Sequence, residues 1–399
     1  MLKFTYIKTL KGGEKMNNNF FMSLGGGNEI GASSYFISCN DKSFLFDMGI
    51  RYIDKRRYPS FSELLKIPAI DTLNDLDGIF LSHAHYDHNG ALPLLVSKII
   101  GTKEIVCTDY TKEFTRVQFE VLKGYKNNKF ILCEKVMAER AVDMLSPYPI
   151  GKKIKKNGYS FTLYKAGHIP GAVMILLEVD DKKILYTGDF SDKSYPLAGK
   201  YELPVISDLD LLIINSTSVF KKDDNWEDTW GNSSRTINDI LKEIILYKEV
   251  NVEVAHVNCG METAILLNDT LENISFSHLG INIYVDEKID SMLQVLREKE
   301  NKEYKYIKLI PPSVTTANNI FITVRGNESL KGIKKLNVYY SLHETYKGIK
   351  DLILKLNPKK TLITHYEPSK EKEEILVKDL EKKGYFNCEY VINNEIYNF

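Results

Sequence analysis

The chain has 399 residues, of which 43% are hydrophobic, so it can bury a sizeable core and is long enough for two domains or one domain with a large insertion. Its 53 basic and 53 acidic residues cancel, so net charge gives no sign of nucleic-acid binding. The five cysteines lack Cys-x-x-Cys spacing, which argues against a disulfide framework or a thiolate zinc site. No apolar run reaches the length of a membrane span, and the N-terminus lacks the apolar core of a signal peptide. We therefore expect a cytoplasmic protein with no membrane partner.

Residues 1–15 are expected to lie outside the fold. Lys11-Gly12-Gly13-Glu14-Lys15 is what a purine-rich bacterial ribosome-binding site would encode if it were translated. This suggests that translation starts at Met16, so that the preceding residues are a non-native extension. The alternative is an ordinary disordered tail.

The segment from Phe20 to Gly49 predicts a strand, a glycine-rich turn and a hairpin. The apolar residues alternate on both sides of the turn at 25–31, and the hairpin ends in Asp47-Met48-Gly49. The glycine-rich turn lacks the lysine and hydroxyl residue that end a P-loop. We therefore do not expect it to hold a nucleotide phosphate.

Three histidines and a carboxylate lie within six residues, directly after the buried strand predicted at Ile79–Leu81. They are His83, His85, Asp87 and His88. Imidazole and carboxylate are ligands of zinc and comparable divalent ions, and no cysteine nearby would make a closed structural site. The pattern predicts a catalytic metal site, where the alternative is scattered surface histidines.

This His-x-His-x-Asp-His sequence resembles the first metal motif of the metallo-β-lactamase-fold hydrolases. The resemblance implies an α/β protein in which two sheets and their outer helices form an αββα sandwich. It also implies a two-metal centre at one edge of the sheets, with further ligands later in the chain.

Two later segments resemble the remaining motifs of that family. Gly167-His168-Ile169-Pro170-Gly171 follows the strand predicted at Tyr159–Tyr164 and is similar to Gly-His-x-x-Gly, although a lone histidine is more often a packed or surface residue. Thr187-Gly188-Asp189 ends the strand predicted at Lys183–Tyr186 and matches Thr-Gly-Asp, although aspartate after glycine is ordinarily a turn residue. The resemblance implies that both segments supply metal ligands.

Residues 218–339 are expected to form an inserted α/β domain with a parallel sheet. Residues 16–217 and 340–399 would form the surrounding metallo-β-lactamase domain. The helices and strands expected in the insert are a helix at Arg235–Tyr247, a strand at Asn251–Val257, a helix at Met261–Asn273 and strands at Ile281–Val285 and Ile320–Val324.

The chain beyond the insert resembles the β-CASP nucleases, the metallo-β-lactamase subgroup that contains RNase J and the pre-mRNA 3′-end endonuclease. A strand leads into Ser341-Leu342-His343, a helix is expected over Lys347–Leu356, and a second strand leads into His365-Tyr366-Glu367-Pro368. This order is similar to the C-terminal signature of the subgroup. The glycine-rich turn at 25–31 resembles the subgroup's opening turn.

The resemblance implies a complete set of metal ligands. One metal would be held by His83, His85 and His168, the other by Asp87, His88 and His365, with Asp189 between them. We expect Zn²⁺, with Mn²⁺ as the alternative, because the same ligands accept both. A hydroxide bridging the two ions would attack phosphorus, as in other two-metal hydrolases.

His343 lies at the family position credited with donating a proton to the leaving 3′-oxygen. The alternative is that it orients a metal ligand. Asn215 replaces the Asp or Glu of the subgroup at the end of the strand before the insert, and could hydrogen-bond His343 but not raise its pKa by charge. Cys259-Gly260-Met261-Glu262 stands where the subgroup has Gly-Arg, so a phosphate-binding guanidinium is missing.

Together these features predict a two-metal-dependent phosphodiesterase whose substrate and partner is single-stranded RNA, cleaved internally, from the 5′ end, or both. Asp87, Asn215 and His343 are its expected catalytic residues. One alternative is a hydrolase of DNA or of a small ester, thioester or cyclic nucleotide, because the fold hosts many hydrolyses. Another is a weakly active nucleic-acid-binding subunit. The sequence also leaves a homo-oligomer open.

Overall fold

The computed structural model describes residues 19–51, 58–67, 70–123, 135–217, 233–273, 280–311, 318–325, 330, 332–338 and 342–399. They fall into two compact units. The first comprises the described residues of Met1–Asp192, Lys200–Lys221 and His343–Phe399, and the second those of Lys193–Gly199 and Lys222–Leu342. The extension at 1–15, the start at Met16 and the residues at which the insert was expected to begin and end, 218 and 339, lie outside the described part.

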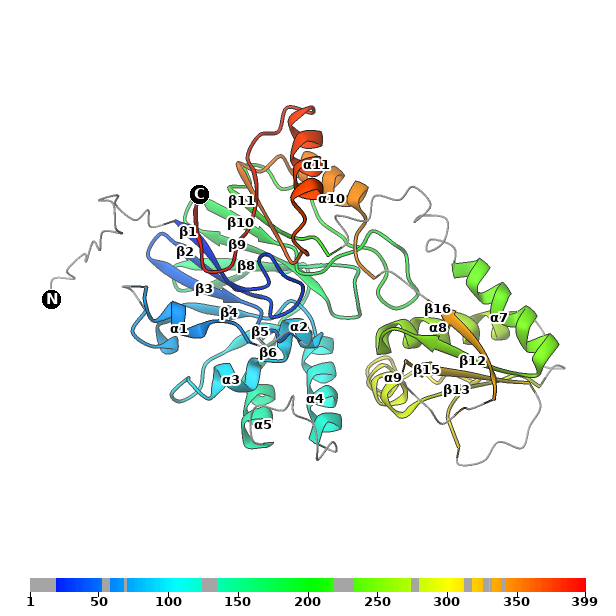
Figure 1. Cartoon of the computed structure of the whole chain (residues 1–399). Helices are drawn as coiled ribbons and strands as arrows, with labels where there is room; N and C mark the ends of the chain where they lie inside the picture. Colours follow the sequence, from blue (N-terminus) through cyan, green and yellow to red (C-terminus); the bar gives the residue numbers. More distant parts are fainter. Residues whose placement is uncertain are drawn as a thin grey trace. The chain divides into compact units, whose positions relative to one another are not determined.

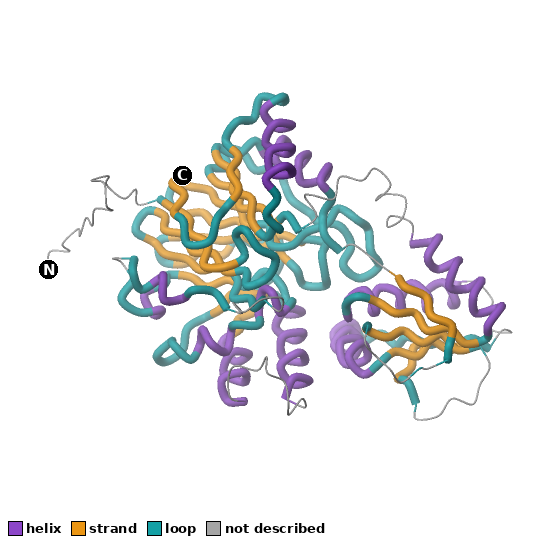
Figure 2. The backbone as a smooth tube through the Cα atoms, in the orientation of Figure 1, coloured by secondary structure: helices purple, strands orange, loops and turns teal. Residues whose placement is uncertain are grey.

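The first unit contains two seven-stranded sheets, coloured orange in Figure 2. The first sheet has the strand order β19-β1-β2-β3-β4-β5-β6. Its strands are β1 (Phe20–Gly25), β2 (Ser34–Cys39), β3 (Lys42–Phe46), β4 (Gly78–Phe80), β5 (Ile105–Cys107), β6 (Leu145–Pro147) and β19 (Ile396–Asn398). β1, β2 and β3 pair antiparallel, whereas β3 to β6 pair parallel.

The second sheet has the strand order β18-β17-β11-β10-β9-β8-β7. Its strands are β7 (Ile154–Lys156), β8 (Tyr159–Lys165), β9 (Val173–Val179), β10 (Lys182–Tyr186), β11 (Leu211–Asn215), β17 (Lys360–Thr364) and β18 (Cys388–Tyr390). β10, β11 and β17 are parallel neighbours. Because β9 runs antiparallel to both β8 and β10, the carboxyl ends of β8, β10, β11 and β17 meet at one edge of the sheet.

The two sheets pack face to face through a core of aromatic and β-branched side chains. Phe46 and Phe80 of the first sheet stack 5.0 Å apart, and Tyr186 of the second sheet packs edge-on against Phe46 at 5.5 Å. All three side chains are fully buried. β9 and β11 are almost continuously apolar, as expected for strands covered on both faces.

Helices cover the outer faces of both sheets (Figure 1). On the first sheet they are α1 (Phe61–Leu64), the 3₁₀ turn η1 (Leu73–Asp75), α2 (Tyr86–Asn89), α3 (Leu92–Val96), α4 (Asp109–Lys123) and α5 (Lys135–Met144). A second apolar cluster joins α1, α3 and α5 to the outer face of that sheet. α10 (Tyr346–Leu356) and α11 (Lys370–Glu381) lie against the second sheet. The predicted αββα sandwich is confirmed.

The second unit is a three-helix, five-stranded α/β structure within the described residues. Its strands pair parallel in the order β14-β13-β15-β12-β16. The chain order is α7 (Ser233–Tyr247), β12 (Glu249–Val254), α8 (Val257–Asn273), β13 (Asn282–Val285), α9 (Glu287–Glu300), β14 (Ile307–Leu309), β15 (Asn319–Val324) and β16 (Lys334–Val338). The predicted parallel sheet is confirmed, with element ends shifted by one to four residues. Among the helices that the structure describes, none has the length and apolar character needed to cross a membrane.

Candidate metal centre

The histidine-rich segment lies in the loop between β4 and the short helix α2. His83 and His85 occupy the loop, and Asp87 and His88 lie on α2. Backbone bonds from neighbouring strand ends fix this loop: the N–H of Met48 donates to the carbonyl of His88 at 2.7 Å, and that of Ser33 donates to the carbonyl of Asp87 at 3.0 Å. Backbone hydrogen bonds to residues next to β2 and β3 therefore hold the loop in place without a metal ligand.

Gly49 permits this close approach. A Cβ atom at Gly49 would lie 1.6 Å from the carbonyl oxygen of Asp87, so any other residue at this position would force the backbone to move. Gly167 has a similar role beside His168, because its φ is +73° and a Cβ there would lie 2.4 Å from the carbonyl of Ser191. Both glycines let metal-binding segments pack directly onto another backbone.

The remaining candidate ligands come from the carboxyl ends of three strands in the second sheet. His168 follows β8, Asp189 follows β10, and His365 follows β17. His365 has a left-handed backbone with φ of +58°, and its N–H donates to the carbonyl of Gly26 at 2.7 Å. This bond ties the C-terminal ligand to the glycine-rich turn.

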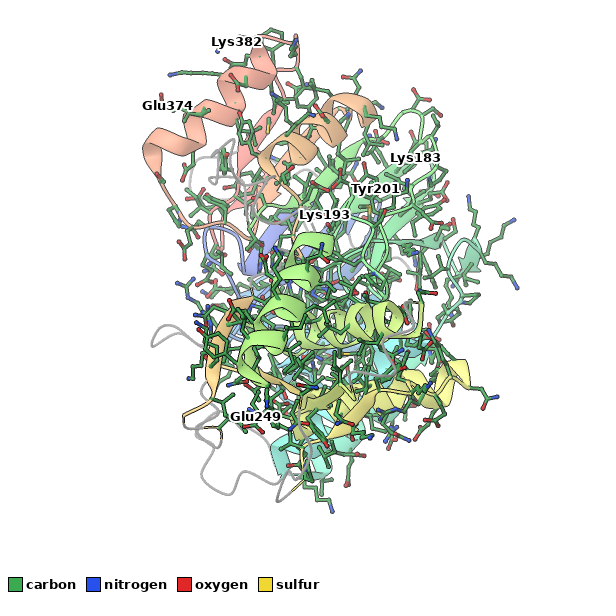
Figure 3. The ribbon with its side chains drawn as sticks, turned by 90° about the vertical axis from the view of Figure 1, so that its right-hand side faces the viewer. Lys183, Lys193, Tyr201, Glu249, Glu374 and Lys382 are labelled. Carbon is green, nitrogen blue, oxygen red and sulfur yellow. The ribbon has the colours of Figure 1, made fainter. Side chains whose placement is uncertain are left out.

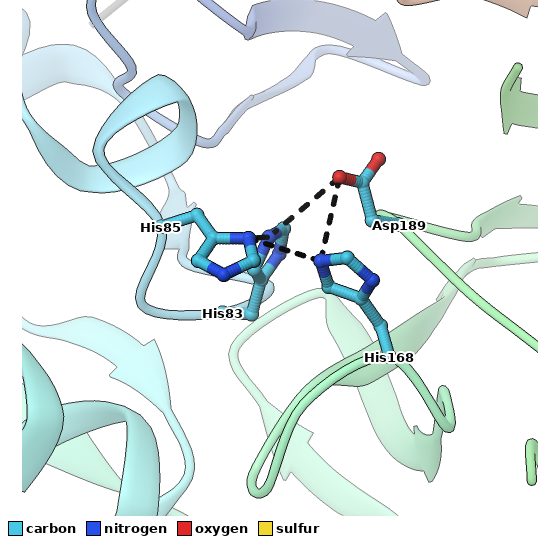
Figure 4. Close-up of side chains that lie close together, drawn as sticks. All are labelled: His83, His85, His168 and Asp189. Atoms are coloured by element: carbon cyan, nitrogen blue, oxygen red, sulfur yellow. Dashed lines mark hydrogen bonds and ion pairs between the residues drawn. The ribbon is translucent and has the colours of Figure 1, made fainter. Parts of the chain in front are cut away.

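His83, His85, His168 and Asp189 form the first cluster (Figure 4). Nδ1 of His85 lies 3.2 Å from Nε2 of His83 and 3.0 Å from Nε2 of His168. Oδ2 of Asp189 lies 3.8 Å and 3.6 Å from the same two Nε2 atoms. Three imidazoles and one carboxylate converging in this way match the donor set of a divalent metal.

Asp87, His88, His365 and the shared Asp189 form the second cluster. Oδ2 of Asp87 lies 3.9 Å from Nε2 of His88 and 3.5 Å from Nε2 of His365. Oδ2 of Asp189 lies 3.5 Å from Nε2 of His88. Asp189 is therefore the only residue common to the two clusters found in the described part of the chain.

Buried atoms without partners show that these residues fit metal ions. Nε2 of His88, Nε2 of His365 and Oδ2 of Asp189 are buried and have no hydrogen-bond partner within the described structure. A buried polar atom left unpaired costs about 1–3 kcal/mol, so three of them in one place call for another binding partner. A divalent cation at each cluster would satisfy them.

Asp47 orients two of the histidines, a role that the sequence analysis did not identify. Its Oδ2 accepts hydrogen bonds from Nδ1 of His88 at 2.7 Å, from the Ser82 hydroxyl at 2.7 Å and from the Tyr186 hydroxyl at 2.5 Å. Because the Ser82 hydroxyl donates to Asp47, it accepts from Nδ1 of His83 at 2.9 Å. Both rings thus carry the proton on Nδ1 and turn the Nε2 lone pair toward the centre.

Charge and burial shift the pKa values of this centre in opposite directions. Burial would raise the pKa of Asp189, but nearby histidines, His343 first, hold it well below its usual value. Burial and then the charges of neighbouring histidines lower the pKa of His83. Burial would also lower the pKa of His88, but the surrounding carboxylates raise it well above its usual value, so without a metal this ring also holds a proton on Nε2 that a bound cation would displace. Metal binding needs deprotonated ligands. An ionised Asp189 beside a neutral His83 therefore suits a metal site.

His343 lies beside Asp189, with Nδ1 3.4 Å from Oδ2 of that carboxylate. Its side chain is 29% exposed, in contrast to the fully buried His83, His88, His168 and His365. Burial is the main cause of a lowered pKa of His343, so the ring is neutral near pH 7. This position allows contact with both a ligand and solvent.

Asn215 does not make the expected bond to His343. Its amide donates to Oδ1 of Asp189 at 3.2 Å and to the Tyr186 hydroxyl at 3.4 Å, and its carbonyl oxygen accepts from Thr364 at 2.8 Å. The bond to His343 that the sequence allowed for Asn215 is therefore not among those that the described structure forms, and a catalytic role for Asn215 stays a prediction. Since β11 lies between β10 and β17, its last residue faces Asp189 directly, and Asn215 orients that carboxylate.

Comparison with known proteins matches part of the chain to one superfamily. The sequence description of the metallo-beta-lactamase superfamily matches residues 27–194. A solved structure of a protein of unknown function from Enterococcus faecalis V583 superposes with a TM-score of 0.62, covering 96% of this chain and 100% of that one. With 12% sequence identity, this likeness concerns the fold alone.

Several proteins with RNA-processing names are similar to this chain. "Cleavage and polyadenylation specificity factor subunit 3" of Dictyostelium discoideum is 30% identical over 218 residues, which are 53% of this chain and 27% of that protein. "RNase aCSPSF2" of Saccharolobus solfataricus is 31% identical over 205 residues, 50% of this chain and 39% of that protein. The chain thus aligns with less than half the length of both relatives.

One relative matches over most of its length. "Probable RNase MJ4" of Methanocaldococcus jannaschii is 27% identical over 356 residues, which are 84% of this chain and 76% of that protein. The similarity between this chain and the Methanocaldococcus jannaschii protein therefore extends well beyond residues 27–194.

Proposed function

We propose that this chain, whose residues 27–194 match the description of the metallo-β-lactamase superfamily, is a two-metal-dependent hydrolase that cleaves single-stranded RNA. The observation that carries the proposal is the pair of ligand clusters joined by Asp189, with buried atoms that lack partners within the described residues. Relatives named as RNases and as a cleavage factor support RNA as the substrate.

The proposed roles follow from the geometry of each side chain. His83, His85 and His168 would hold one metal, Asp87, His88 and His365 the other, and Asp189 would contact both. Two bound ions would supply Lewis-acid chemistry and activate water at neutral pH. Asp47 and Asn215 keep the ligands oriented, because they hydrogen-bond His88 and Asp189.

His343 is proposed to act on the leaving group. Its ring is partly exposed and adjoins Asp189, so it can contact a substrate lying over the metals. A neutral imidazole can stabilise a developing 3′-oxyanion by donating its ring N–H. A metal-orienting role would need His343 to hold a ligand as closely as Asp47 holds His88 at 2.7 Å, whereas Nδ1 of His343 lies 3.4 Å from Oδ2 of Asp189.

The choice of metal and the cellular setting are also proposals. We propose Zn²⁺ as the bound metal, with Mn²⁺ as the alternative, because nitrogen-rich sites with carboxylates accept both. Four described cysteines, Cys39, Cys107, Cys259 and Cys388, are buried free thiols. Such thiols fit a reducing cytoplasm.

The experiment that tests the function is cleavage of a 5′-labelled single-stranded RNA and its DNA counterpart by metal-reconstituted protein. The wild type should release RNA fragments in a metal-dependent manner, and fragment lengths would distinguish internal from 5′-end cleavage. Asp87→Ala removes a proposed ligand and should abolish cleavage. Asp181→Ala removes an exposed carboxylate in a turn between strands and serves as the matched control.

Two results would contradict the proposal. Equal cleavage by the wild type and Asp87→Ala would refute the assignment of the metal centre. Preferential cleavage of DNA, or of neither polymer despite two bound metals per chain, would replace RNA by another substrate.

A further inference from the structure

An open pocket of about 710 Å³ lies in the first unit, and its lining includes Tyr164 and Lys165 at the end of β8, the strand that His168 follows. This volume suits a ligand of nucleotide size. Its polar lining has three lysines, two tyrosines and two carboxylates, which are Tyr164, Lys165, Asp192, Lys200, Tyr201, Glu202 and Lys355. The proposed function assigns no role to these residues.

Backbone bonds join the pocket to the metal centre. The N–H of Ser191 donates to the carbonyl of Ala166 at 2.9 Å, and the N–H of Tyr201 donates to the carbonyl of Ser191 at 2.8 Å. Lys165 precedes His168 by three residues, and Asp192 follows Asp189 by three. Three residues span at most about 10 Å, so the backbones of Lys165 and Asp192 each lie within about 10 Å of the backbone of a proposed metal ligand.

The positive charge in the pocket is not fully neutralised by the protein. Lys165 pairs with Glu202 at 3.4 Å, but the ammonium groups of Lys200 and Lys355 have no ion pair with any described residue. Both lysines are exposed. Two unpaired cations near a phosphodiester centre favour a polyanionic ligand.

The tyrosines provide flat surfaces for an unpaired base. Tyr164 and Tyr201 are half-buried, so each is anchored yet still accessible. The ring of Tyr201 packs against Phe190, the residue directly after Asp189, with centroids 5.8 Å apart and planes at 71°. Tyr201 is labelled among the side chains drawn in Figure 3. Aromatic side chains beside lysines are the usual surface for single-stranded nucleic acid.

Asp192 favours the binding of a base, rather than of a second phosphate, at its position in the pocket. Asp192 would repel a phosphate but can accept a hydrogen bond from an exocyclic amino group of a base. Its backbone is fixed, because its N–H donates to Oε2 of the buried Glu344 at 2.7 Å. Glu344 directly follows His343, so one contact holds both the pocket wall and the segment of the proposed catalytic histidine.

We propose that this pocket binds an unpaired nucleotide of the RNA next to the scissile phosphate, with its base against Tyr164 and Tyr201 and its backbone phosphates facing Lys200 and Lys355. The proposal rests on the proposed function, because it assigns a substrate position to the same site. The pocket would hold the strand in register with the metal centre.

Binding of a fluorescent ten-nucleotide single-stranded RNA to the Asp87→Ala protein tests the proposal without cleavage. The double variant K200E/K355E should weaken binding at least tenfold and reduce the slope of log Kd against log salt by about 0.7 for each lost phosphate contact. K98E/K383E changes the net charge equally at exposed positions of the first unit and should leave the Kd within about twofold of its original value. Tyr201→Phe keeps the ring and should bind normally, whereas Tyr201→Ala should bind weakly.

Measurements of turnover distinguish an incorrect pocket assignment from an incorrect proposed function. In the cleavage-competent protein, K200E/K355E should raise the KM for RNA and leave hydrolysis of bis(p-nitrophenyl) phosphate, a small diester, unchanged. If the wild type cleaves RNA and K200E/K355E has the same Kd and KM for RNA as the wild type, the pocket assignment is wrong but the proposed function is not contradicted. An equal loss of small-diester turnover would also overturn it, because the effect would then arise at the metal centre. Absence of both RNA cleavage and RNA binding in every form would overturn the proposed function and the pocket together.

Discussion

Oδ2 of Asp47 lies 2.7 Å from Nδ1 of His88, and both side chains are fully buried. The bond fixes which ring nitrogen carries the proton and directs Nε2 toward the second ligand cluster. The same oxygen accepts from Ser82, which in turn holds His83 of the first cluster. A single carboxylate therefore orients ligands of both proposed metals.

Asp47→Asn should weaken metal binding without unfolding the protein. Asp47 has a left-handed backbone with φ of +56°, which asparagine tolerates better than alanine does. Loss of an orienting carboxylate typically costs about 10–100-fold in metal affinity. Metal affinity measured by competition with a chelator should fall in this range. Asp181→Ala is the control, and equal affinity in Asp47→Asn and the wild type would contradict the orienting role.

His343→Ala should slow RNA cleavage by about 10²–10⁴-fold while two metals remain bound. The ring lies beside Asp189 but outside both ligand clusters, so its removal leaves the proposed ligands in place. Turnover and metal content per chain should be measured on the same preparation. Loss of one metal from this variant would make His343 a ligand and remove it from the leaving-group role.

The ligand clusters could be predicted because their residues follow strands in short, distinctive motifs. The segment from His83 to His88 contains four potential ligands at fixed spacing, and His168 and Asp189 each follow a predicted strand. The parallel pairing of β10, β11 and β17 then brings distant strand ends to one edge. The sandwich was predicted from the resemblance of these motifs to the metallo-β-lactamase-fold hydrolases, and the parallel sheet of the second unit from its alternation of helices and strands.

The orienting contacts could not be predicted because they depend on tertiary pairing. Asp47 is 35 residues from Ser82 and 41 from His88 along the chain, and only the parallel pairing of β3 with β4 brings them together. In sequence, Asp47 before Met48-Gly49 reads as a turn residue. The contact of Asn215 with Asp189 could not be predicted for the same reason, since it depends on the pairing of β11 with β10. Helix α8 begins at Val257, four residues earlier than expected, because burial of Cys259 and Gly260 outweighs the low helix propensity of glycine.

Gly49→Ala should disturb the metal loop by a steric mechanism alone. The added methyl group would lie 1.6 Å from the carbonyl oxygen of Asp87, so α2 must move to admit it. We expect a loss of about 1–3 kcal/mol in the free energy of unfolding, as for overpacked cores, together with weaker metal binding. Urea unfolding and chelator competition would measure the two effects. A variant with stability within about 0.5 kcal/mol of the wild type and normal metal affinity would show that the loop accommodates the change.

Glu262 gives the second unit a dependence on pH. Its buried carboxylate on α8 accepts hydrogen bonds from the N–H groups of Ala198 at 2.9 Å and Leu197 at 3.1 Å. Burial is the largest influence and raises the pKa of Glu262 to about 7, although the two backbone bonds oppose the shift. The folded protein therefore retains a proton there that the unfolded chain releases near its ordinary pKa of 4.5.

Glu262→Gln should remove this dependence. Below pH 4.5 both states of the wild type are protonated at this position, so the carboxyl group carries no charge penalty. As the pH rises toward 7, the unfolded state loses the proton first, and the free energy of unfolding falls by up to about 3 kcal/mol. Glutamine does not titrate, so the stability of the wild type relative to the variant should decrease between pH 5 and pH 8 in urea unfolding. Parallel pH profiles for the two proteins would mean that Glu262 ionises equally in the folded and unfolded states, and that its burial does not penalise the charge.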